Sequence, residues 1–503
     1  MIGDSRQTRL AVVLILPVAL VGLGFVLDAR GTFPLLRFAI ERSASRAPST
    51  LIVPPDELRR GVSTVSLYLR PQDLTDPKTG ILPNRLQHGP AWERYGWVSF
   101  FEGGRVVHSS GVGVRIHGGG SRVGTGPQGF RLFFRRRYGL HELPGGIAFD
   151  GAHAHPLRRL ILHSDVRRSR NGLAWHLVNP LAYDIAAAAG GITSATRPVR
   201  FLLNGRFQGV FVLKEHFHPQ HYFETHAGHR VNLKAAEFDE LWRQVADLRP
   251  LRMQRVARLV DLDNLTRWFI GVVFCATADA YQGPAQFRDP TRADAQWFWV
   301  SWDMDGSFRD PKVDSFPYLL SRTGRRRARR PSDPRPRILT TLLDEDADYR
   351  AYFMRVWVDV MNHALTPEFL DQRFRYYRDL GQTLGLENRA DLPLIEQFLR
   401  ERPAIVRTHA ERWLGTPPSV PVAVVGDRGA LEVDGHVVQP GWTGHYFPGM
   451  TVSIRVPEVM AYALSHWRVN GREVHSATLA IEAREALEIE PIWVRGATLP
   501  RLP

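Results

Sequence analysis

The chain has 503 residues, 44% of them hydrophobic and 23% charged, which is long enough for two or three domains with substantial cores. This composition excludes a wholly disordered or collagen-like protein. The one cysteine, Cys275, excludes an intrachain disulfide, and the apolar run around it indicates a buried thiol.

The formal net charge is +14, and half of that excess lies between Arg322 and Arg337. This stretch lacks the interleaved aromatic residues on which single-stranded bases stack, so it disfavours nucleic acid as a partner. It is typical of a solvated basic loop, and docking of an acidic or phosphorylated partner is the alternative.

The first 30 residues contain an uninterrupted apolar segment. From Leu10 to Leu27 every residue is apolar, Gly or Pro, and as a helix the segment would extend about 27 Å, close to the hydrocarbon core of about 30 Å. We therefore expect residues 1–30 to be a transmembrane signal anchor that makes the chain a single-pass cell-membrane protein with an extracytoplasmic soluble part. A buried helix of a soluble domain is the alternative. The composition of Ser43 to Pro55 predicts a linker over residues 31–55.

Short strands dominate the next part of the chain, and Asn204-Gly205 is its strongest hairpin signal because Asn-Gly readily adopts positive φ. A helix is expected from Asn171 to Ala189, where apolar residues recur every four positions before Gly190. The predicted strands are Val62–Tyr68, Trp97–Phe101, Val106–Ile116, Phe130–Phe134, Leu160–His163, Arg197–Leu203 and Phe207–Leu213, with a meander around Gly118–Gly120.

The second half of the sequence favours helices. Asp263 is the expected N-cap of a helix through Val273, and at least two amphipathic helices are predicted between Ile338 and Leu384. A further helix is expected over Pro403–Leu414, before Gly415. From Val420 onward, turns such as Asp434-Gly435 and Asn470-Gly471 separate short alternating runs, which predicts a small all-β domain.

The segment most suggestive of chemistry is a buried strand, Trp297–Trp302, that runs into Asp303-Met304-Asp305-Gly306. Residues two apart on a strand face the same side, so the sequence predicts two neighbouring carboxylates at a strand end. Such carboxylates are suited to Mg²⁺, and Asp279, at the end of the preceding helix, is a third candidate. The alternative is a turn in which an Asp side chain caps its own backbone.

Several motifs occur in an order that resembles the spore-coat-protein-H (CotH) kinase family, from about Val106 to about Gly415. They are GVGVRIHGGGSR (111–122), GFRLFFRRRYG (129–139), LILHSDVRRSRN (160–171), VRFLLNGRFQGVFVLKE (199–215), LDNLTRWFI (262–270), the segment around Asp279 and WDMDGSF (302–308). The resemblance implies an atypical, minimal protein-kinase-like fold of the α+β class. It also implies binding of ATP with Mg²⁺, or possible use of Mn²⁺, and transfer of the γ-phosphoryl group to Ser or Thr of a protein substrate.

The same resemblance assigns roles to particular residues. Asp279 is similar to the catalytic Asp that would orient and deprotonate the acceptor hydroxyl, and Asp303 and Asp305 are similar to the metal-binding pair. Glu215 resembles the acid that positions a basic phosphate ligand. Phosphoryl transfer requires mainly positioning and charge neutralisation, which agrees with these roles.

The basic residues and one amide complete the implied site. Arg122 and Arg131 lie where the family gathers basic residues around the nucleotide, and Gln286 stands where the family commonly has a metal-binding Asn. Gln128 occupies the region in which the family has a phosphate-binding Lys. Arg131 is the candidate replacement, although a planar guanidinium differs from an ammonium group.

We therefore predict four parts: the anchor at 1–30, the linker at 31–55, a CotH kinase-like domain at 56–415 and a C-terminal β domain at 416–503. The predicted function is ATP- and Mg²⁺-dependent phosphorylation of a protein by an atypical kinase of the bacterial cell envelope. The alternative is a non-catalytic, pseudokinase-like protein of envelope or surface assembly, which the missing Lys would favour.

Overall fold

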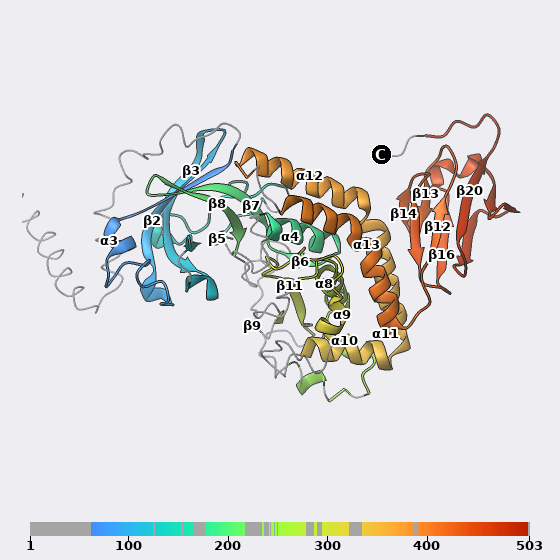
Figure 1. Ribbon diagram of the computed structural model, residues 1–503, viewed down its shortest axis with the longest axis horizontal. Coiled ribbons are helices and arrows are strands. Elements are labelled where there is room, and N and C mark those ends of the chain that lie inside the picture. Colours follow the sequence, from blue (N-terminus) through green and yellow to red (C-terminus); the bar gives the residue numbers. More distant parts are fainter. Residues whose placement is uncertain are drawn as a thin grey trace, which may run out of the picture. The chain divides into compact units, whose positions relative to one another are not determined.

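The computed structural model describes residues 62–123, 126–151, 154–164, 177–216, 234–235, 241, 243–245, 247–248, 250–277, 286–288, 294–320, 334–386 and 391–500. These residues form two compact units (Figure 1). The first draws its described residues from Met1–Arg167, Ala195–Gly228 and Gln382–Leu386, and the second from Arg168–Ser194, His229–Gly381 and Glu387–Pro503.

The first unit is a closed β-barrel, whose strands are joined in the order β1-β2-β3-β4-β5-β8-β7. The strands are β1 (Thr64–Leu69), β2 (Arg94–Glu102), β3 (Arg105–His117), β4 (Gly129–Phe133), β5 (Arg159–His163), β7 (Thr196–Leu203) and β8 (Arg206–Glu215). A ring of antiparallel neighbours needs an even number of strands, so a barrel of seven requires a parallel junction. That junction is β1 with β7, where Thr64 pairs with Arg200.

The barrel interior is an apolar core to which every strand contributes, including Val65, Val112 and Leu160. Short helices lie between the strands: α3 (Pro71–Thr75), η2 (Pro90–Trp92), η3 (Gly120–Arg122) and η4 (Arg136–Tyr138). The predicted hairpin is confirmed, because Asn204 and Gly205 both have positive φ, 50° and 75°, between β7 and β8.

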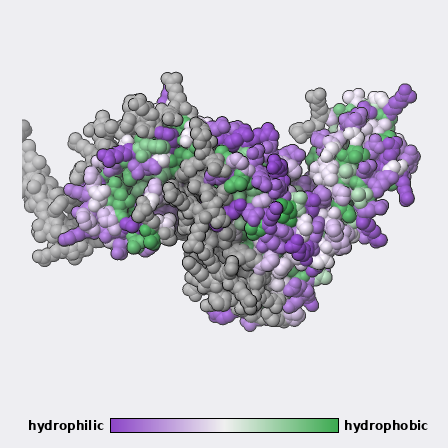
Figure 2. Space-filling view, in the orientation of Figure 1, coloured by the Kyte–Doolittle hydropathy of each residue, from purple (hydrophilic) through white to green (hydrophobic). Residues whose placement is uncertain are grey.

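The second unit is mainly helical around a small sheet of order β6-β11-β10-β9. Its helices are α4 (Val178–Ala188), α7 (Met253–Val256), α8 (Leu262–Phe274), α9 (Ser315–Leu320), α10 (Pro334–Glu345), α11 (Ala347–Asp359), the π-helix η6 (Val360–Ala364), α12 (Pro367–Thr383) and α13 (Leu392–Leu414). The strands are β6 (Ile192–Thr193), β9 (Lys234–Ala235), β10 (Gln286–Arg288) and β11 (Phe298–Ser301). Helix α12 buries Leu370, Phe374 and Tyr377, and Figure 2 shows hydrophilic residues over the surface around it.

Two of the predicted helix ends are wrong. Asp261, rather than Asp263, caps α8, because its side chain accepts a hydrogen bond from the amide of Asn264 at 2.9 Å. Helix α13 does not begin at Pro403 but runs through it from Leu392. A proline inside a helix removes one hydrogen bond, and burial of the apolar stripe on both sides of Pro403 maintains the helix. The first described residue of the helix expected from Asn171 is Val178, and residues 171–176 lie outside the described part.

The last part of the second unit is all-β, as predicted. It contains a sheet of order β15-β12-β20-β17-β18 and a sheet of order β14-β13-β16-β19. The strands are β12 (Val420–Val424), β13 (Leu431–Val433), β14 (His436–Val438), β15 (Thr443–Tyr446), β16 (Thr451–Arg455), β17 (Leu464–Val469), β18 (Arg472–Val474), β19 (Thr478–Glu482) and β20 (Leu487–Trp493), with η7 (Glu458–Ala463) before β17.

These sheets contact the helices through η6. The ring of His363 stacks on His436 at a centroid distance of 4.1 Å and on Trp442 at 5.3 Å. The side chain of Asn362 accepts a hydrogen bond from the amide of His445 at 2.9 Å and donates one to its carbonyl at 3.2 Å. Polar and aromatic contacts therefore fix the β sheets to the helical part of the same unit.

Among the described residues, no helix is both long enough and apolar enough to span a bilayer. The segment Leu10–Leu27, on which the transmembrane prediction depends, lies outside them.

Candidate functional site

The loop after β11 carries Asp303 and Asp305, both partly exposed. The strand ends at Ser301, and Asp303 has a left-handed backbone with φ of 57°. Its amide donates a hydrogen bond of 3.3 Å to the hydroxyl of Tyr183, a buried residue of α4. The period-two argument that placed the two carboxylates on the same side is therefore wrong, because the chain has already left the strand.

Hydrogen bonds join this loop to the end of α8. The hydroxyls of Thr277 and Ser307 lie 2.8 Å apart, and the amide of Phe308 donates to the carbonyl of Cys275 at 3.0 Å. Asp279 lies outside the described residues, two positions after Thr277 in the sequence. The end of α8 that leads to Asp279 thus lies next to the loop that carries Asp303 and Asp305.

Strained backbone is concentrated at the same two segments. The described residues other than Gly with positive φ fall into two groups of three. Asn204, Asp434 and Asn470 each precede Gly in a hairpin turn, where this conformation is expected. Ala276, Asp303 and Phe308 have no such turn, and strained residues of this kind are typical of functional sites.

A buried arginine holds the two segments in place. Arg402 of α13 is fully buried, with 0% exposure, and burial lowers its pKa to about 10. Its Nη2 and Nε donate to the carbonyls of Val273 and Phe274 at 2.6 and 2.9 Å, which satisfies the end of α8. Its Nη1 donates to the carbonyls of Pro311 and Val313 at 2.6 and 2.8 Å. One guanidinium therefore fixes the segment before Asp279 and the segment after Asp305.

The third predicted metal ligand, Gln286, is described by its backbone alone. It is the first residue of β10 and pairs with Trp299, two residues before the end of β11. Its backbone therefore lies near the strand end from which Asp303 emerges. Within the described part of the chain, no three His, Cys, Asp or Glu side chains are grouped so that they could hold a metal ion.

The barrel unit carries a separate group of basic side chains on its outer face. Strand pairing places Arg115, Arg131, Ile161 and Lys214 in one row across β3, β4, β5 and β8. Like charges directly opposite each other in a sheet are destabilising, so the Arg115–Arg131 pair requires compensation. The positive charge of Arg115 is balanced by Glu93, whose carboxylate accepts a hydrogen bond from Nε of Arg115 at 2.8 Å.

Arg131 is the predicted nucleotide ligand in this row. Its Nη2 lies 3.2 Å from Nδ1 of His117, and its buried Nε has no hydrogen-bond partner. Burial and the neighbouring charges of Arg122, Arg115 and Arg159 lower its pKa to about 10, so it is still a cation at neutral pH. A partly buried cation with an unused donor is suited to an anionic ligand.

Arg122, the other predicted nucleotide ligand, is engaged with backbone instead. Only 6% exposed, it donates through Nη1 to the carbonyls of Arg85 and Gln87 at 3.1 and 2.9 Å, and through Nη2 to that of Ile116 at 2.6 Å. These contacts fasten the segment before η2 to β3.

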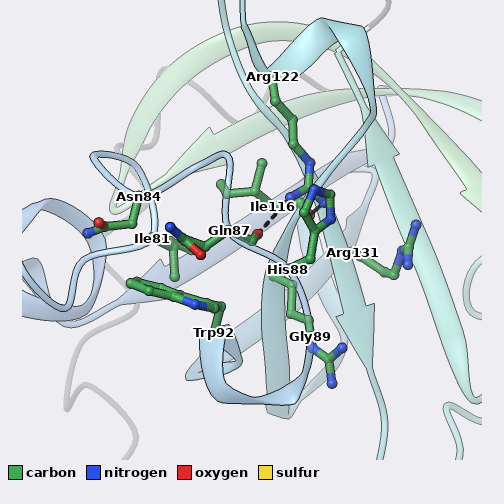
Figure 3. A pocket seen from close by; sticks show the side chains of 10 residues that line it. Ile81, Asn84, Gln87, His88, Gly89, Trp92, Ile116, Arg122 and Arg131 are labelled. Atoms are coloured by element: carbon green, nitrogen blue, oxygen red, sulfur yellow. Dashed lines mark hydrogen bonds between the residues drawn. The ribbon is translucent and has the colours of Figure 1, made fainter.

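Arg122 also lines a pocket of about 50 Å³. In Figure 3 its guanidinium points toward Gln87, whereas the side chain of Arg131 points away from the pocket. The pocket is lined by Ile81, Asn84, Gln87, His88, Gly89, Trp92, Arg115, Ile116, Arg122 and Arg131. The two predicted basic ligands are thus on the same unit but differ in what they contact.

Glu215 is buried at the end of β8, and one carboxylate oxygen lies 3.3 Å from Nε2 of His155. It shares the inward face of the strand with the core residue Leu213, whereas Lys214 faces outward. Glu215 and the basic row therefore lie on opposite faces of the barrel wall.

Comparison with known proteins agrees with the expected family. Residues 232–391, about a third of the chain, match the family described as CotH kinase protein. The matched segment contains Asp279, Gln286, Asp303 and Asp305.

A solved structure described as the Helicobacter pylori proinflammatory kinase CtkA is also similar. Its sequence identity is 11%, with 57% of this chain and 94% of that chain covered, and the TM-score is 0.28. A TM-score this low supports no conclusion about mechanism. No curated protein matches the chain.

Sequence reasoning missed Arg402 and Lys214. Arg402 occupies a position in the apolar stripe of α13, between Leu399 and Val406, and a charged residue at such a position was the available signal. Lys214 stands in an otherwise apolar strand, and only the pairing of β5 with β8 places it two strands from Arg131.

Proposed function

We propose that the protein is an atypical kinase that uses ATP and Mg²⁺ to phosphorylate Ser or Thr of a protein substrate. The observation that carries the proposal is the family match over residues 232–391, which includes Asp279, Asp303 and Asp305. The hydrogen-bonded loops that carry Asp303 and lead toward Asp279 support it. We also propose that the two units correspond to a protein-kinase-like fold.

In this proposal the side chains of the protein position the metal ion and the acceptor hydroxyl. Asp303 and Asp305 offer hard oxygen donors of the kind that Mg²⁺ prefers, and they would hold the ion with Gln286. When bound, the ion neutralises charge on the transferred phosphoryl group. Asp279 would accept the proton of the acceptor hydroxyl, and Arg402 keeps the segments that carry these acids together.

The test is phosphate transfer by the purified full-length chain from labelled ATP with Mg²⁺ or Mn²⁺ to a Ser-rich protein acceptor. Asp303→Asn is the sharpest variant, because Asn tolerates the left-handed backbone at this position whereas Ala would add strain. Asp310→Asn is the matched control, since Asp310 is an exposed carboxylate in the same loop.

We expect Asp303→Asn to lose about a hundredfold or more in transfer rate, as is typical when a group that stabilises transferring charge is removed. The control should retain the wild-type rate. Absence of transfer by the wild type, or equal rates for wild type and Asp303→Asn, contradicts the proposal.

The second candidate function is a non-catalytic role in assembly of the cell envelope. It is favoured by the engagement of Arg122 with three carbonyls and by Gln128, whose amide donates to the carbonyl of Gly126 at 3.0 Å. Thermal stabilisation separates the candidates, because a ligand at 100 times its Kd adds about 2.7 kcal/mol. No stabilisation by any nucleotide with Mg²⁺ favours assembly.

We further propose that Leu10–Leu27 anchors the chain in the cell membrane with its soluble part outside the cytoplasm. The apolar length of the segment supports this proposal. Alkaline extraction of membranes and protease accessibility of intact cells test it. Release of the full-length chain by alkali would contradict anchoring.

A further inference from the structure

The C-terminal β sheets carry a cleft of about 510 Å³ that shares no residue with the candidate site. We name it the C-terminal cleft. Its walls are the segment that leads into β13, part of η7 and the segment that follows β20. The lining includes Ala430, Met460 and Leu499, which are apolar, and Arg428 and Gln439, which are polar. Its volume is in the range of about 300–1,000 Å³ that is usual for sites that bind small molecules.

Contacts within the protein hold the walls of the cleft in place. The indole of Trp493 donates a hydrogen bond to the carbonyl of Arg428 at 3.1 Å. Gly429 has a φ of 85°, and a Cβ at this position would lie 2.3 Å from the ring of Trp493 and 3.0 Å from the side chain of Leu499. The glycine therefore allows the segment before β13 and the segment after β20 to pack directly against each other.

An exposed aromatic ring lies beside the cleft. Tyr462 of η7 is 69% exposed, although aromatic side chains usually bury most of their area. Its hydroxyl donates a hydrogen bond of 2.6 Å to the carbonyl of Thr498, which lines the cleft. This bond restricts the rotation of the ring. Val459 and Val494 are exposed as well, and the amide of Val494 donates to the carbonyl of Ala463 in η7 at 2.8 Å. The ring therefore presents a fixed apolar surface to solvent.

The charges at the cleft are balanced. Among the described residues that line it, Arg428 is the only one with a charged side chain. Exposed residues of both signs adjoin the lining in the sequence: Asp427 and Glu458 are acidic, and Arg495 is basic. Gln439 is exposed, and its amide can both donate and accept hydrogen bonds. The cleft is therefore suited to a neutral polar ligand rather than to an ion.

We propose that the C-terminal cleft binds an oligosaccharide of N-acetylated sugars. The apolar C–H face of a sugar ring would stack on Tyr462. The methyl of an acetamido group would contact Ala430, Met460 or Leu499, and its amide would form hydrogen bonds with the side chain of Gln439. A mainly apolar lining with a few placed polar groups is typical of ligand sites. The inference does not depend on the proposed kinase function, because these residues take no part in it.

A sugar fits this cleft better than an extended peptide does. Strands β13 and β20, which adjoin the cleft in the sequence, are both internal to their sheets. They therefore offer no free edge to a peptide that binds by strand addition. A sugar is recognised by side chains and requires no such edge.

The test is calorimetric titration of the full-length chain with chitotetraose, an oligomer of N-acetylglucosamine. Cellotetraose is the matched sugar, because it has the same ring and linkage but lacks the acetamido groups. We expect chitotetraose to bind at millimolar concentration. We expect cellotetraose to bind at least about fivefold more weakly, since the hydrogen bonds and the methyl contact of the acetamido group are lost.

Two variants separate the contributions of the ring and of the amide. Tyr462→Ala should weaken binding of chitotetraose by about tenfold or more, whereas Tyr462→Phe keeps the ring and should stay within about threefold of wild type. Gln439→Leu should weaken chitotetraose by about fivefold and leave cellotetraose unchanged. Tyr376→Ala is the matched control, because Tyr376 is an exposed tyrosine of α12, and it should change affinity less than about twofold.

The inference is overturned if chitotetraose does not bind at millimolar concentration, if the two sugars bind equally, or if Tyr462→Ala and Tyr376→Ala have equal effects. Binding of the peptide Ala-Thr-Leu-Pro, the sequence of residues 497–500, in place of chitotetraose would also overturn it. Should Tyr462→Ala not fold, the ratio of the two sugar affinities in Gln439→Leu still decides. Failure of phosphate transfer from ATP would refute the kinase and leave the result for the cleft unchanged.

Discussion

Replacing Arg402 with Met should destabilise the second unit strongly. Met preserves the length of the apolar stem but leaves four backbone carbonyls, at 2.6 to 2.9 Å in the native protein, without their donor. Hydrogen bonds from charged donors contribute about 1.5–3 kcal/mol each, so four of them would sum to about 6–12 kcal/mol. Relief of the desolvation cost of a fully buried guanidinium offsets part of this. We therefore expect a net loss of about 4 kcal/mol.

The change can be measured by urea unfolding of the full-length chain, followed by fluorescence, with circular dichroism as a check that the transitions coincide. Hydrogen exchange should locate the effect, with faster exchange at the end of α8 and over the segment from Pro311 to Val313. Arg400→Met is the control, since Arg400 is exposed on the same helix and should change stability by less than about 0.5 kcal/mol.

Arg402→Lys separates charge from geometry. The ammonium group of Lys keeps the charge, but it lacks the planar guanidinium that donates both to the end of α8 and to the segment from Pro311 to Val313. We therefore expect about half the loss seen with Met, roughly 2 kcal/mol. A loss below about 1 kcal/mol for Arg402→Met, or equal exchange rates at the end of α8, would refute the assignment of Arg402 as the tie between these segments.

Three further predictions concern stability. Burial raises the pKa of Glu93, but the hydrogen bond of Tyr138 and the charges of the surrounding arginines lower it overall. Glu93→Gln should therefore reduce the free energy of unfolding by about 3 kcal/mol, as measured with urea. The difference between wild type and variant should disappear as the pH falls through the lowered pKa of Glu93. Ala276→Gly should stabilise the chain by about 0.5–1 kcal/mol because Ala276 has a φ of 49°, and a lower melting temperature would contradict this. Burial lowers the pKa of His363 and of His445 to about 4, helped by the charge of His436 for the first and of Arg407 for the second. Both histidines are therefore neutral in the folded protein, and the melting temperature should decrease as the pH is lowered from about 6.5 to about 4. Replacing both histidines with Gln should make this decrease smaller.

Local signals made much of the fold predictable. The turns at Asn204, Asp434 and Asn470 form as expected, because Asn-Gly and Asp-Gly accept positive φ regardless of the rest of the chain. Closure of the barrel was not predictable, since it depends on pairing Thr64 with Arg200, more than a hundred residues away. No local pattern distinguishes a closing strand from an edge strand.

The candidate site was predictable in its residue types but not in its geometry. The strand before Asp303 was recognised from its apolar run, whereas the left-handed backbone at Asp303 depends on contacts with α4 and α8 that are distant in sequence. Arg122 was assigned to the nucleotide because of its charge, and only the fold shows which carbonyls it binds. Charge is visible in a sequence, but the partner of that charge is not.

Closure of the seven-stranded ring also affects how the protein behaves toward other chains. Every barrel strand has hydrogen-bonded neighbours on both sides, so the described strands of the barrel present no open row of amides and carbonyls along which an extended peptide could add. The C-terminal sheets end in β14, β15, β18 and β19, which are bordered on one side only. Among the described strands, a partner that binds by strand addition would therefore pair with one of these edges, or with β6 or β9 of the small sheet, and not with the barrel.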